Sequence, residues 1–230
     1  MIANSSPRLA VDALVFDAYG TLFDVASISV ACADVVPHPQ ELVRLWRAKQ
    51  LEYSFLRSLM GPAAYVDFWT ITANALDYAT EALGVNVSTS ARERMLSGWL
   101  DVKPCAEVEP ALDALERQAR RCAILSNGTP SMLQAALHRS GLSARFQHVL
   151  SVDRVRVYKP DSRVYRLVVD SLAVPIDELL FVSSNGWDAA GAAASGLPVA
   201  WINRGGTPIE RLGFTPQTIV RNLTELLIAN

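Results

Sequence analysis

The chain has 230 residues, is 50% hydrophobic and carries a formal net charge of −2. This length and composition suffice for one large domain, or a domain with an insertion, around a sizeable core. The charges are scattered, so the absence of a basic stripe argues against nucleic-acid binding, and no acidic tail indicates disorder.

The cysteine pattern and the beginning of the chain predict a cytoplasmic protein. Cys32, Cys105 and Cys122 are odd in number and widely spaced, which fits a reducing cytosol better than a disulfide framework or a zinc site. Residues 1–8 are expected to be a loose tail and not a signal peptide, because the apolar part that follows is short and broken by Asp12. No apolar run approaches the roughly 18 residues that a membrane span needs.

The first predicted strand covers residues 13–17, ALVFD, a short apolar run of the kind that is buried on both faces of a parallel sheet. It ends in Asp17, and the end of a buried strand is an unfavourable place for a charge. Taken alone, Asp17 fits two interpretations: a functional carboxylate, or an ordinary cap or turn residue.

A helical module is predicted to follow this strand, over residues 24–103. Residues 39–60 carry apolar side chains at helical spacing, and residues 65–84 form a second helix closed by a glycine. Ser90 and Glu93 predict a capping box at the start of a third helix. A helical insertion over strand ends usually acts as a lid, and a purely structural insertion is the alternative.

Strands and helices alternate through the rest of the chain. Apolar runs that end in polar loops predict strands within residues 122–128, 146–152, 179–186 and 198–203. Helices are predicted over residues 129–141, 161–172, 186–196 and 222–229. This alternation indicates an α/β fold, with a doubly wound parallel sheet of Rossmann-like type and an inserted helical cap domain.

Polar side chains follow several predicted strands at the point where each strand ends. Ligands of open α/β sheets bind outside these carboxyl ends. The residues expected at this edge are Asp17, Tyr19, Thr21, Ser126, Asn127, Lys159, Ser183, Ser184, Asn185 and Asp188. Each alone has an ordinary explanation as a turn, a cap or a solvated charge. Because four separate loops contribute them, together they predict an active site in which Lys159 reaches Asp17.

Four strings in this order and spacing, DAYGTLFDV, LSNGTP, VYKPD and FVSSNGWD, resemble the haloacid dehalogenase superfamily. WRAKQLEYSFLRSLM and AWINR resemble its branch of L-2-haloacid dehalogenases. The resemblance implies a Rossmann-like catalytic core over residues 9–23 and 104–230, with residues 24–103 as the cap. It also implies hydrolysis of (S)-2-haloacids to (R)-2-hydroxyacids through an aspartyl ester. The substrates it implies are small halogenated carboxylic acids and water. It implies no cofactor, and it implies that the protein is a homodimer.

Two departures from the phosphatases of this superfamily follow from the residues. Phosphatases place at position 19 an aspartate that protonates the leaving alkoxide, whereas Tyr19 supplies no acid at neutral pH. A halide leaves as a stable anion and needs no proton. Ser184 stands where phosphatases have their first magnesium aspartate, and a hard cation prefers carboxylate oxygens. No metal is therefore expected, and Lys159 is expected to substitute for its charge.

The resemblance implies that Asp17 is the nucleophile and that Lys159 keeps it ionised. Ser126, Lys159 and the backbone N–H groups of Ala18 and Tyr19 would hold the substrate carboxylate. The residues that would surround the alkyl group are Tyr19, Leu51, Phe68 and Trp187. Those that would orient and activate water for ester hydrolysis are Ser183, Asn185 and Asp188, with Thr21 and Tyr165 in support.

Arg47, with Asn127, would receive the departing halide according to the same resemblance. The helical pattern alone gives a different prediction, because Arg47 lies off the apolar stripe of its helix and would be a surface charge. Ala48 departs from relatives that often have glutamine there, which leaves the preferred chain length of the substrate open.

Two other functions remain as alternatives. A magnesium phosphatase is the first, and Tyr19 and Ser184 oppose it. A non-catalytic phosphoacceptor or binding module on a flavodoxin-like sheet is the second. It would need an acidic cluster around Asp17, and the sequence neighbours of Asp17 are neutral.

Overall fold

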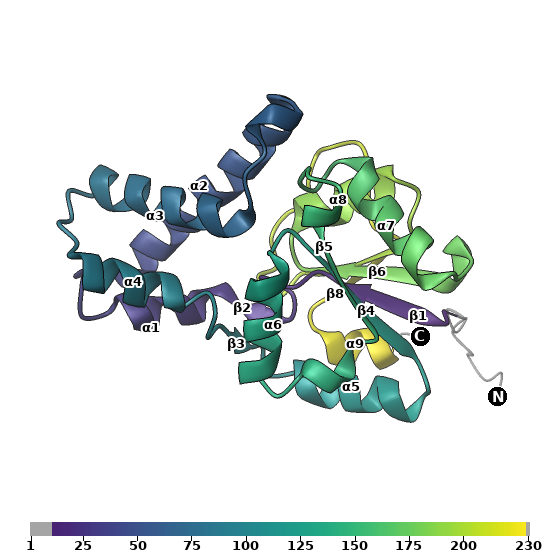
Figure 1. Cartoon of the computed structure of the whole chain (residues 1–230). Helices are drawn as coiled ribbons and strands as arrows, with labels where there is room; N and C mark the ends of the chain where they lie inside the picture. Colours follow the sequence, from purple (N-terminus) through teal and green to yellow (C-terminus); the bar gives the residue numbers. More distant parts are fainter. Residues whose placement is uncertain (1–10, 229–230) are drawn as a thin grey trace.

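The computed structural model describes residues 11–228, and its centre is a six-stranded parallel sheet (Figure 1). The strands lie in the order β5-β4-β1-β6-β7-β8. Their bounds are β1 Ala13–Phe16, β4 Arg121–Ser126, β5 His148–Ser151, β6 Leu179–Ser183, β7 Val199–Ile202 and β8 Thr218–Val220. The central strands are continuous apolar runs because both of their faces are covered.

Helices cover the two faces of this sheet (Figure 1). One face carries α7 Ser162–Leu172 and α8 Gly186–Ala194, and the other carries α5 Val108–Arg117, α6 Pro130–Arg139 and α9 Leu223–Ile228. The chain moves from β1 to β4 on one side, while β6 pairs with β1 on the other side. The sheet therefore has its topological switch point at β1, and a ligand crevice is expected beyond the carboxyl end of this strand.

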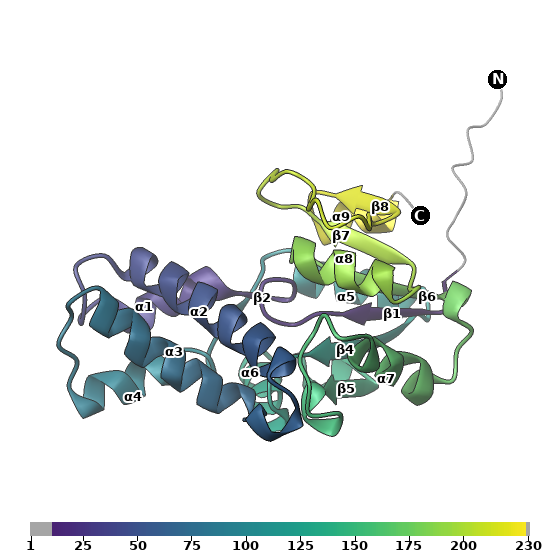
Figure 2. The same ribbon diagram turned by 90° about the horizontal axis from the view of Figure 1, so that it is seen from above.

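A helical cap lies beside the sheet, as Figures 1 and 2 show from two directions. It contains α1 Ser29–Cys32, α2 Pro39–Leu59, α3 Phe68–Ala82 and α4 Thr89–Ser97. The chain enters it through β2 Phe23–Asp24 and leaves through β3 Lys103–Pro104, and these two short strands pair antiparallel. The two crossings between cap and sheet thus form one narrow ribbon.

Aromatic side chains join the cap to the loops beyond the sheet. The Tyr65 hydroxyl donates to Asp153 Oδ1, and the Tyr158 hydroxyl donates to the carbonyl of Val66 at 2.5 Å. The rings of Tyr65 and Tyr158 stack with their centres 5.3 Å apart. These contacts hold the underside of the cap over the carboxyl ends of the strands.

The predicted α/β fold with an inserted helical cap is confirmed, but several elements differ. The third predicted helix of the cap is α4. It is capped by Ser88, whose Oγ accepts from the Ala91 N–H at 3.2 Å, so the predicted capping box of Ser90 and Glu93 is wrong. Ser88, Thr89 and Ser90 are all typical capping residues, and the sequence pattern does not show which of them caps the helix. The second predicted helix is α3, which begins at Phe68 because Asp67 caps it.

Several elements lie outside the predicted pattern. They include helix α1, the ribbon of β2 and β3, helix α5, and the edge strand β8. The two-residue strands of the ribbon are too short for a periodic signal. The predicted tail over residues 1–8, and the outer ends of the predicted core and last helix at residues 9–10 and 229–230, lie outside the described residues. Within residues 11–228, none of the helices combines the length and apolar character that crossing a membrane requires.

Candidate active site

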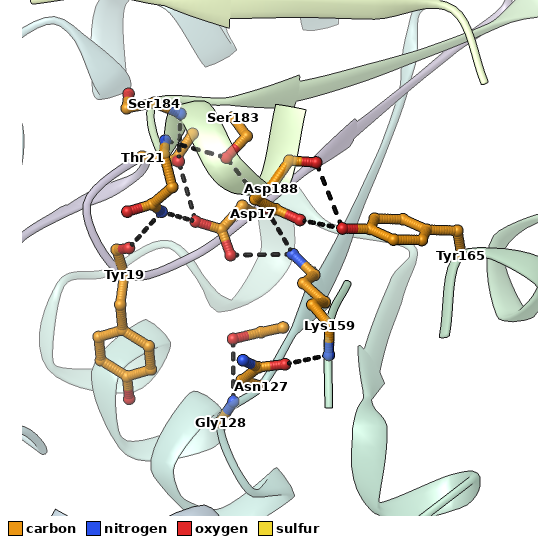
Figure 3. Close-up of polar contacts among 12 residues, drawn as sticks. Asp17, Tyr19, Thr21, Asn127, Gly128, Lys159, Tyr165, Ser183, Ser184 and Asp188 are labelled. Carbon is orange, nitrogen blue, oxygen red and sulfur yellow. Dashed lines mark hydrogen bonds and ion pairs between the residues drawn. The ribbon is translucent and has the colours of Figure 1, made fainter. Parts of the chain in front are cut away.

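Asp17 lies directly after β1, at the switch point of the sheet, and is buried. Its Oδ1 accepts a hydrogen bond from Lys159 Nζ at 3.0 Å. Its Oδ2 accepts from Thr21 Oγ1 at 3.0 Å and from Asn185 Nδ2 at 2.8 Å. Figure 3 shows the donors converging on this carboxylate from separate loops. They fix both oxygens in place, as attack on a bound substrate requires.

Lys159 is a fully buried cation that bridges two carboxylates. Its Nζ lies 3.0 Å from Asp17 Oδ1 and 2.9 Å from Asp188 Oδ2. Burial lowers the pKa of Lys159, but the two carboxylates outweigh burial and raise this pKa above its ordinary value of 10.5. The lysine is therefore protonated at neutral pH, and the predicted pairing of Lys159 with Asp17 is confirmed.

Asp188, in the first turn of α8, is the second buried carboxylate of the site. Its Oδ2 accepts from Ser183 Oγ at 2.9 Å, and its Oδ1 accepts from the Tyr165 hydroxyl at 2.7 Å. Burial raises the pKa of Asp188, and the charge of Lys159 opposes this rise. Burial also raises the pKa of Tyr165, so the phenol stays a neutral donor. Of the residues predicted to activate water or to support that role, Ser183 and Tyr165 thus lie around the Asp188 carboxylate (Figure 3), whereas Asn185 donates to Asp17.

The small residues of α8 allow this close packing. A Cβ atom on Gly191 would lie 2.5 Å from Pro160 Cβ and 2.7 Å from the Tyr165 hydroxyl. Only a residue without a side chain fits there. The backbone of α8 therefore contacts the segment of Lys159 and the ring of Tyr165 directly.

Ser126 and Asn127 follow β4 and are buried at the same edge. Asn127 Oδ1 accepts from the backbone N–H of Lys159 at 3.1 Å, and Ser126 Oγ accepts from the N–H of Gly128 at 3.1 Å. Both side chains are thus held through their acceptor oxygens. The Ser126 hydroxyl proton and the Asn127 amide N–H groups remain as donors toward a ligand.

Ser184, the residue in the position of a magnesium aspartate, contacts a cation. Arg204 Nη1 donates to Ser184 Oγ at 2.6 Å and to the carbonyl of Gly20 at 3.0 Å, and Nη2 donates to the carbonyl of Thr21 at 2.8 Å. Arg204 also pairs with Glu107 at 2.7 Å. A hydroxyl beside a guanidinium fits Mg²⁺ poorly, because Mg²⁺ prefers carboxylate oxygens.

Two further observations bear on a metal site. Among residues 11–228, no group of three or more His, Cys, Asp or Glu side chains is arranged to hold a metal ion. The sequence pattern assigns the substitute charge to Lys159 alone, whereas Arg204 places a second cation at this edge. Lys159 and Arg204 thus both place positive charge at this edge.

Arg47 lies on α2 and is half-buried on the underside of the cap. Its Nη1 donates to Gln50 Oε1 at 2.6 Å, and its Nη2 donates to the carbonyl of Tyr19 at 3.3 Å. The guanidinium carbon lies 5.6 Å from the centre of the Trp99 ring. The surface position that the helical pattern predicts is therefore wrong, because the core covers this polar face of α2. Burial lowers the pKa of Arg47, but a guanidinium still keeps its charge at neutral pH.

Buried and half-buried apolar groups complete the predicted set. Those expected beside the alkyl group or the substrate carboxylate are Ala18, Tyr19 and Phe68, which are buried, and Leu51 and Trp187, which are half-buried. Burial raises the pKa of Tyr19, so its phenol is no acid at neutral pH. The Trp187 ring packs edge-on against Phe55 of α2 at 5.1 Å, which joins the core to the cap above the site. The substrate contacts predicted for these five residues stay predictions.

Four residues that contact the predicted site are given no role in the sequence prediction: Gln50, Phe55, Trp99 and Arg204. Gln50 had a signal, since it lies three residues after Arg47 on the same helix. Arg204 belongs to AWINR at the end of a predicted strand, where polar residues of this sheet gather. Phe55 and Trp99 had no such signal, because an aromatic residue at helical spacing usually belongs to the core.

The chain is similar to several known proteins over most of its length. A family model described as haloacid dehalogenase-like hydrolase matches residues 11–196. The (S)-2-haloacid dehalogenase of Pseudomonas sp. (strain YL) is 44% identical over 214 residues, which cover 93% of this chain and 91% of that protein.

Two solved structures are also similar. The L-2-haloacid dehalogenase RSc1362 is 40% identical with a TM-score of 0.91, and the match covers 95% of this chain and 97% of that one. The L-2-haloacid dehalogenase from Xanthobacter autotrophicus, solved with chloropropionic acid covalently bound, is 37% identical with a TM-score of 0.87, at the same coverage.

Proposed function

The chain belongs to the haloacid dehalogenase-like hydrolases, in their L-2-haloacid dehalogenase branch, and we infer that it is an (S)-2-haloacid dehalogenase, a hydrolase of carbon–halide bonds. It hydrolyses (S)-2-haloacids to (R)-2-hydroxyacids. The observation that carries this function is the buried Asp17 at the switch point, paired with Lys159 and without an acid at position 19.

In the first step Asp17 attacks C2 of the substrate from the side opposite the halogen. A bond forms between a carboxylate oxygen of Asp17 and C2, and the carbon–halogen bond breaks with its electron pair going to the halide. The Ser126 hydroxyl, Lys159 and the N–H groups of Ala18 and Tyr19 hold the substrate carboxylate. These two N–H groups have no hydrogen-bond partner within residues 11–228, which supports this role.

Arg47 and Asn127 receive the halide as it departs. The amide oxygen of Asn127 already accepts from Lys159, so its N–H groups are the part that faces an anion. Arg47 lies on the cap side, across from Asp17, and carries a permanent charge. Negative charge develops on the halogen only as its bond to carbon breaks, so these donors stabilise the transition state more than the bound substrate.

In the second step water attacks the carbonyl carbon of the Asp17 ester. Ser183, Asn185 and Asp188 position this water, and the Asp188 carboxylate takes its proton. The raised pKa of Asp188 makes its carboxylate a better base than an exposed aspartate. The bond between the carbonyl carbon and the ester oxygen then breaks, and the proton held by Asp188 passes to the departing alkoxide oxygen, which becomes the hydroxyl of the product. The regenerated Asp17 carboxyl loses its remaining proton to solvent, so the hydroxyacid keeps an oxygen of Asp17 and the enzyme gains one from water.

The wider setting completes the proposal. Residues 9–23 and 104–230 form the catalytic core, and residues 24–103 form the cap that shields the ester from bulk water. The enzyme works without a metal or cofactor, in the cytoplasm, as a homodimer. The donor set around Ser184 supports the first point and the cysteine usage supports the second. The homodimer is an expectation from the family resemblance alone.

Chloride release from each enantiomer of 2-chloropropionate tests this function. The (S)-enantiomer should release chloride and give (R)-lactate, because displacement from the back inverts C2 once. A control with p-nitrophenyl phosphate and magnesium tests the phosphatase alternative. Release of phosphate from that compound, without chloride from either enantiomer, would contradict the proposed function.

A further inference from the structure

The charge of Arg47 is held by neutral partners. Among residues 11–228, no carboxylate lies within salt-bridge distance of its guanidinium, although other arginines of the protein pair with Asp or Glu. Its shortest hydrogen bond, at 2.6 Å, goes to the amide oxygen of Gln50. A carboxylate at this place would hold the guanidinium equally well but would cancel the charge that attracts an anion.

Gln50 continues into a second, fully buried polar residue. Gln50 Nε2 donates to Thr72 Oγ1 of α3 at 2.6 Å, and Thr72 Oγ1 donates to the carbonyl of Phe68 at 2.6 Å. Both Gln50 and Thr72 are 0% exposed. The Trp46 indole also donates to the Thr72 carbonyl at 2.7 Å, which fixes the threonine against α2.

The direction of these bonds is determined by chemistry. The single hydroxyl proton of Thr72 is used by Phe68, so Thr72 can only accept from Gln50. The NH₂ group of Gln50 must then face Thr72, and its oxygen must face Arg47. A swapped amide would place NH₂ against the guanidinium donors and leave buried donors without acceptors, at a cost of about 1–3 kcal/mol each.

We propose that Gln50 and Thr72 are positioning residues that aim the Arg47 guanidinium at the departing halide while leaving its charge uncompensated. This inference rests on the proposed function, in which Arg47 is the halide acceptor. The relay Phe68 carbonyl–Thr72–Gln50–Arg47 lies within the cap, and Gln50 and Thr72 touch no reacting atom. Their effect should therefore appear in the carbon–halogen cleavage step and should depend on the halogen.

The test measures halide release in single turnovers of the full chain with (S)-2-chloro- and (S)-2-bromopropionate. Thr72→Val keeps the shape of the side chain and removes the acceptor for Gln50. Losing this one hydrogen bond should slow chloride release about tenfold. Bromide release should slow less, because bromide is the better leaving group and depends less on the donors. Thr72→Ser keeps the hydroxyl and should restore both rates.

Thr80→Val is the matched control. Thr80 lies on the same helix, is 8% exposed, and donates to the carbonyl of Leu76 at 3.1 Å, but it has no contact with the relay. This variant should release both halides at the normal rate. Gln50→Glu is the second test: it preserves the side-chain shape and the contact with Arg47 but adds a compensating charge. It should slow chloride release by about 10²-fold, a typical loss for an electrostatic stabiliser of developing charge.

Two outcomes would overturn the inference. If Thr72→Val and Gln50→Glu both fold and keep the normal chloride rate and the normal chloride-to-bromide ratio, while Arg47→Lys is slow, the relay does not position Arg47. If Arg47→Lys releases chloride at the normal rate, Arg47 is not the halide acceptor, and Gln50 and Thr72 then have no role in positioning it. A merely structural role would lower thermal stability in Thr72→Val and leave the halide ratio unchanged.

Discussion

Lys159→Met should destabilise the protein strongly, because one lysine serves two buried carboxylates. Its Nζ lies 3.0 Å from Asp17 and 2.9 Å from Asp188, and the lysine side chain is 1% exposed. Removing one partner of a buried ion pair typically costs about 3–5 kcal/mol. Since two carboxylates lose their cation here, we expect a loss of about 4–5 kcal/mol in the free energy of unfolding at pH 8. Turnover should be lost as well.

The pH dependence of this loss has a definite sign. Burial raises the pKa of Asp188, and Lys159 opposes that rise, so the pKa rises further in the variant. A carboxyl with a raised folded-state pKa binds its proton more tightly in the native state than in the unfolded chain. The stability of the variant therefore increases, relative to the wild type, as the pH falls through this raised pKa. The destabilisation should be largest at pH 8 and smaller at pH 5.

Urea unfolding of both proteins at pH 8 and pH 5 measures this effect. Lys49→Met is the control, because Lys49 pairs with Glu52 at the surface, where ion pairs contribute little. Its unfolding midpoint should match that of the wild type at both pH values. A Lys159→Met variant that loses less than about 1 kcal/mol, or loses the same amount at both pH values, would refute the reasoning from buried charge.

Three further predictions concern the reaction. Arg47→Lys should lose about 10²-fold in kcat, because lysine lacks the planar fork that receives the developing halide charge. Rapid quench should then find no accumulated ester, and a near-normal rate would show that Arg47 is not the halide acceptor. Chloride release should persist in excess EDTA, because Ser184 presents a hydroxyl beside the Arg204 guanidinium where Mg²⁺ would need carboxylate oxygens. Loss of chloride release that magnesium restores would favour a metal-dependent reaction. Tyr165→Phe removes a hydroxyl that donates to Asp188 at 2.7 Å, so ester hydrolysis should slow about tenfold and the Asp17 ester should accumulate. Slowed halide release without accumulated ester would contradict a role of Tyr165 in ester hydrolysis.

The sequence predicts well the parts of the fold and site that local patterns encode. Buried parallel strands are continuous apolar runs, and polar residues at their ends meet at one edge, so the strand pattern alone is enough to group Asp17, Lys159 and Asp188. The cap is visible in the sequence because its long helices interrupt the alternation of strands and helices.

The remainder depends on contacts between distant segments. The helical pattern places Arg47 in solvent because the pattern records only which face packs on other cap helices, and the core covers the opposite face. The neutral relay of Gln50 and Thr72 spans 22 residues and two helices, so no periodic signal links them. Arg204 contacts Ser184 only because β7 lies beside β6, a pairing that the sequence alone does not specify.

The most direct test of the central claim is a single-turnover reaction in H₂¹⁸O with enzyme in excess over (S)-2-chloropropionate. If Asp17 forms the ester and water attacks its carbonyl carbon, peptide mass spectrometry should find the ¹⁸O in the carboxylate of Asp17. The lactate formed in this first turnover should carry none. Label that goes directly into lactate, with none in the peptide that contains Asp17, would show that water attacks the substrate itself and would contradict the nucleophilic role of Asp17.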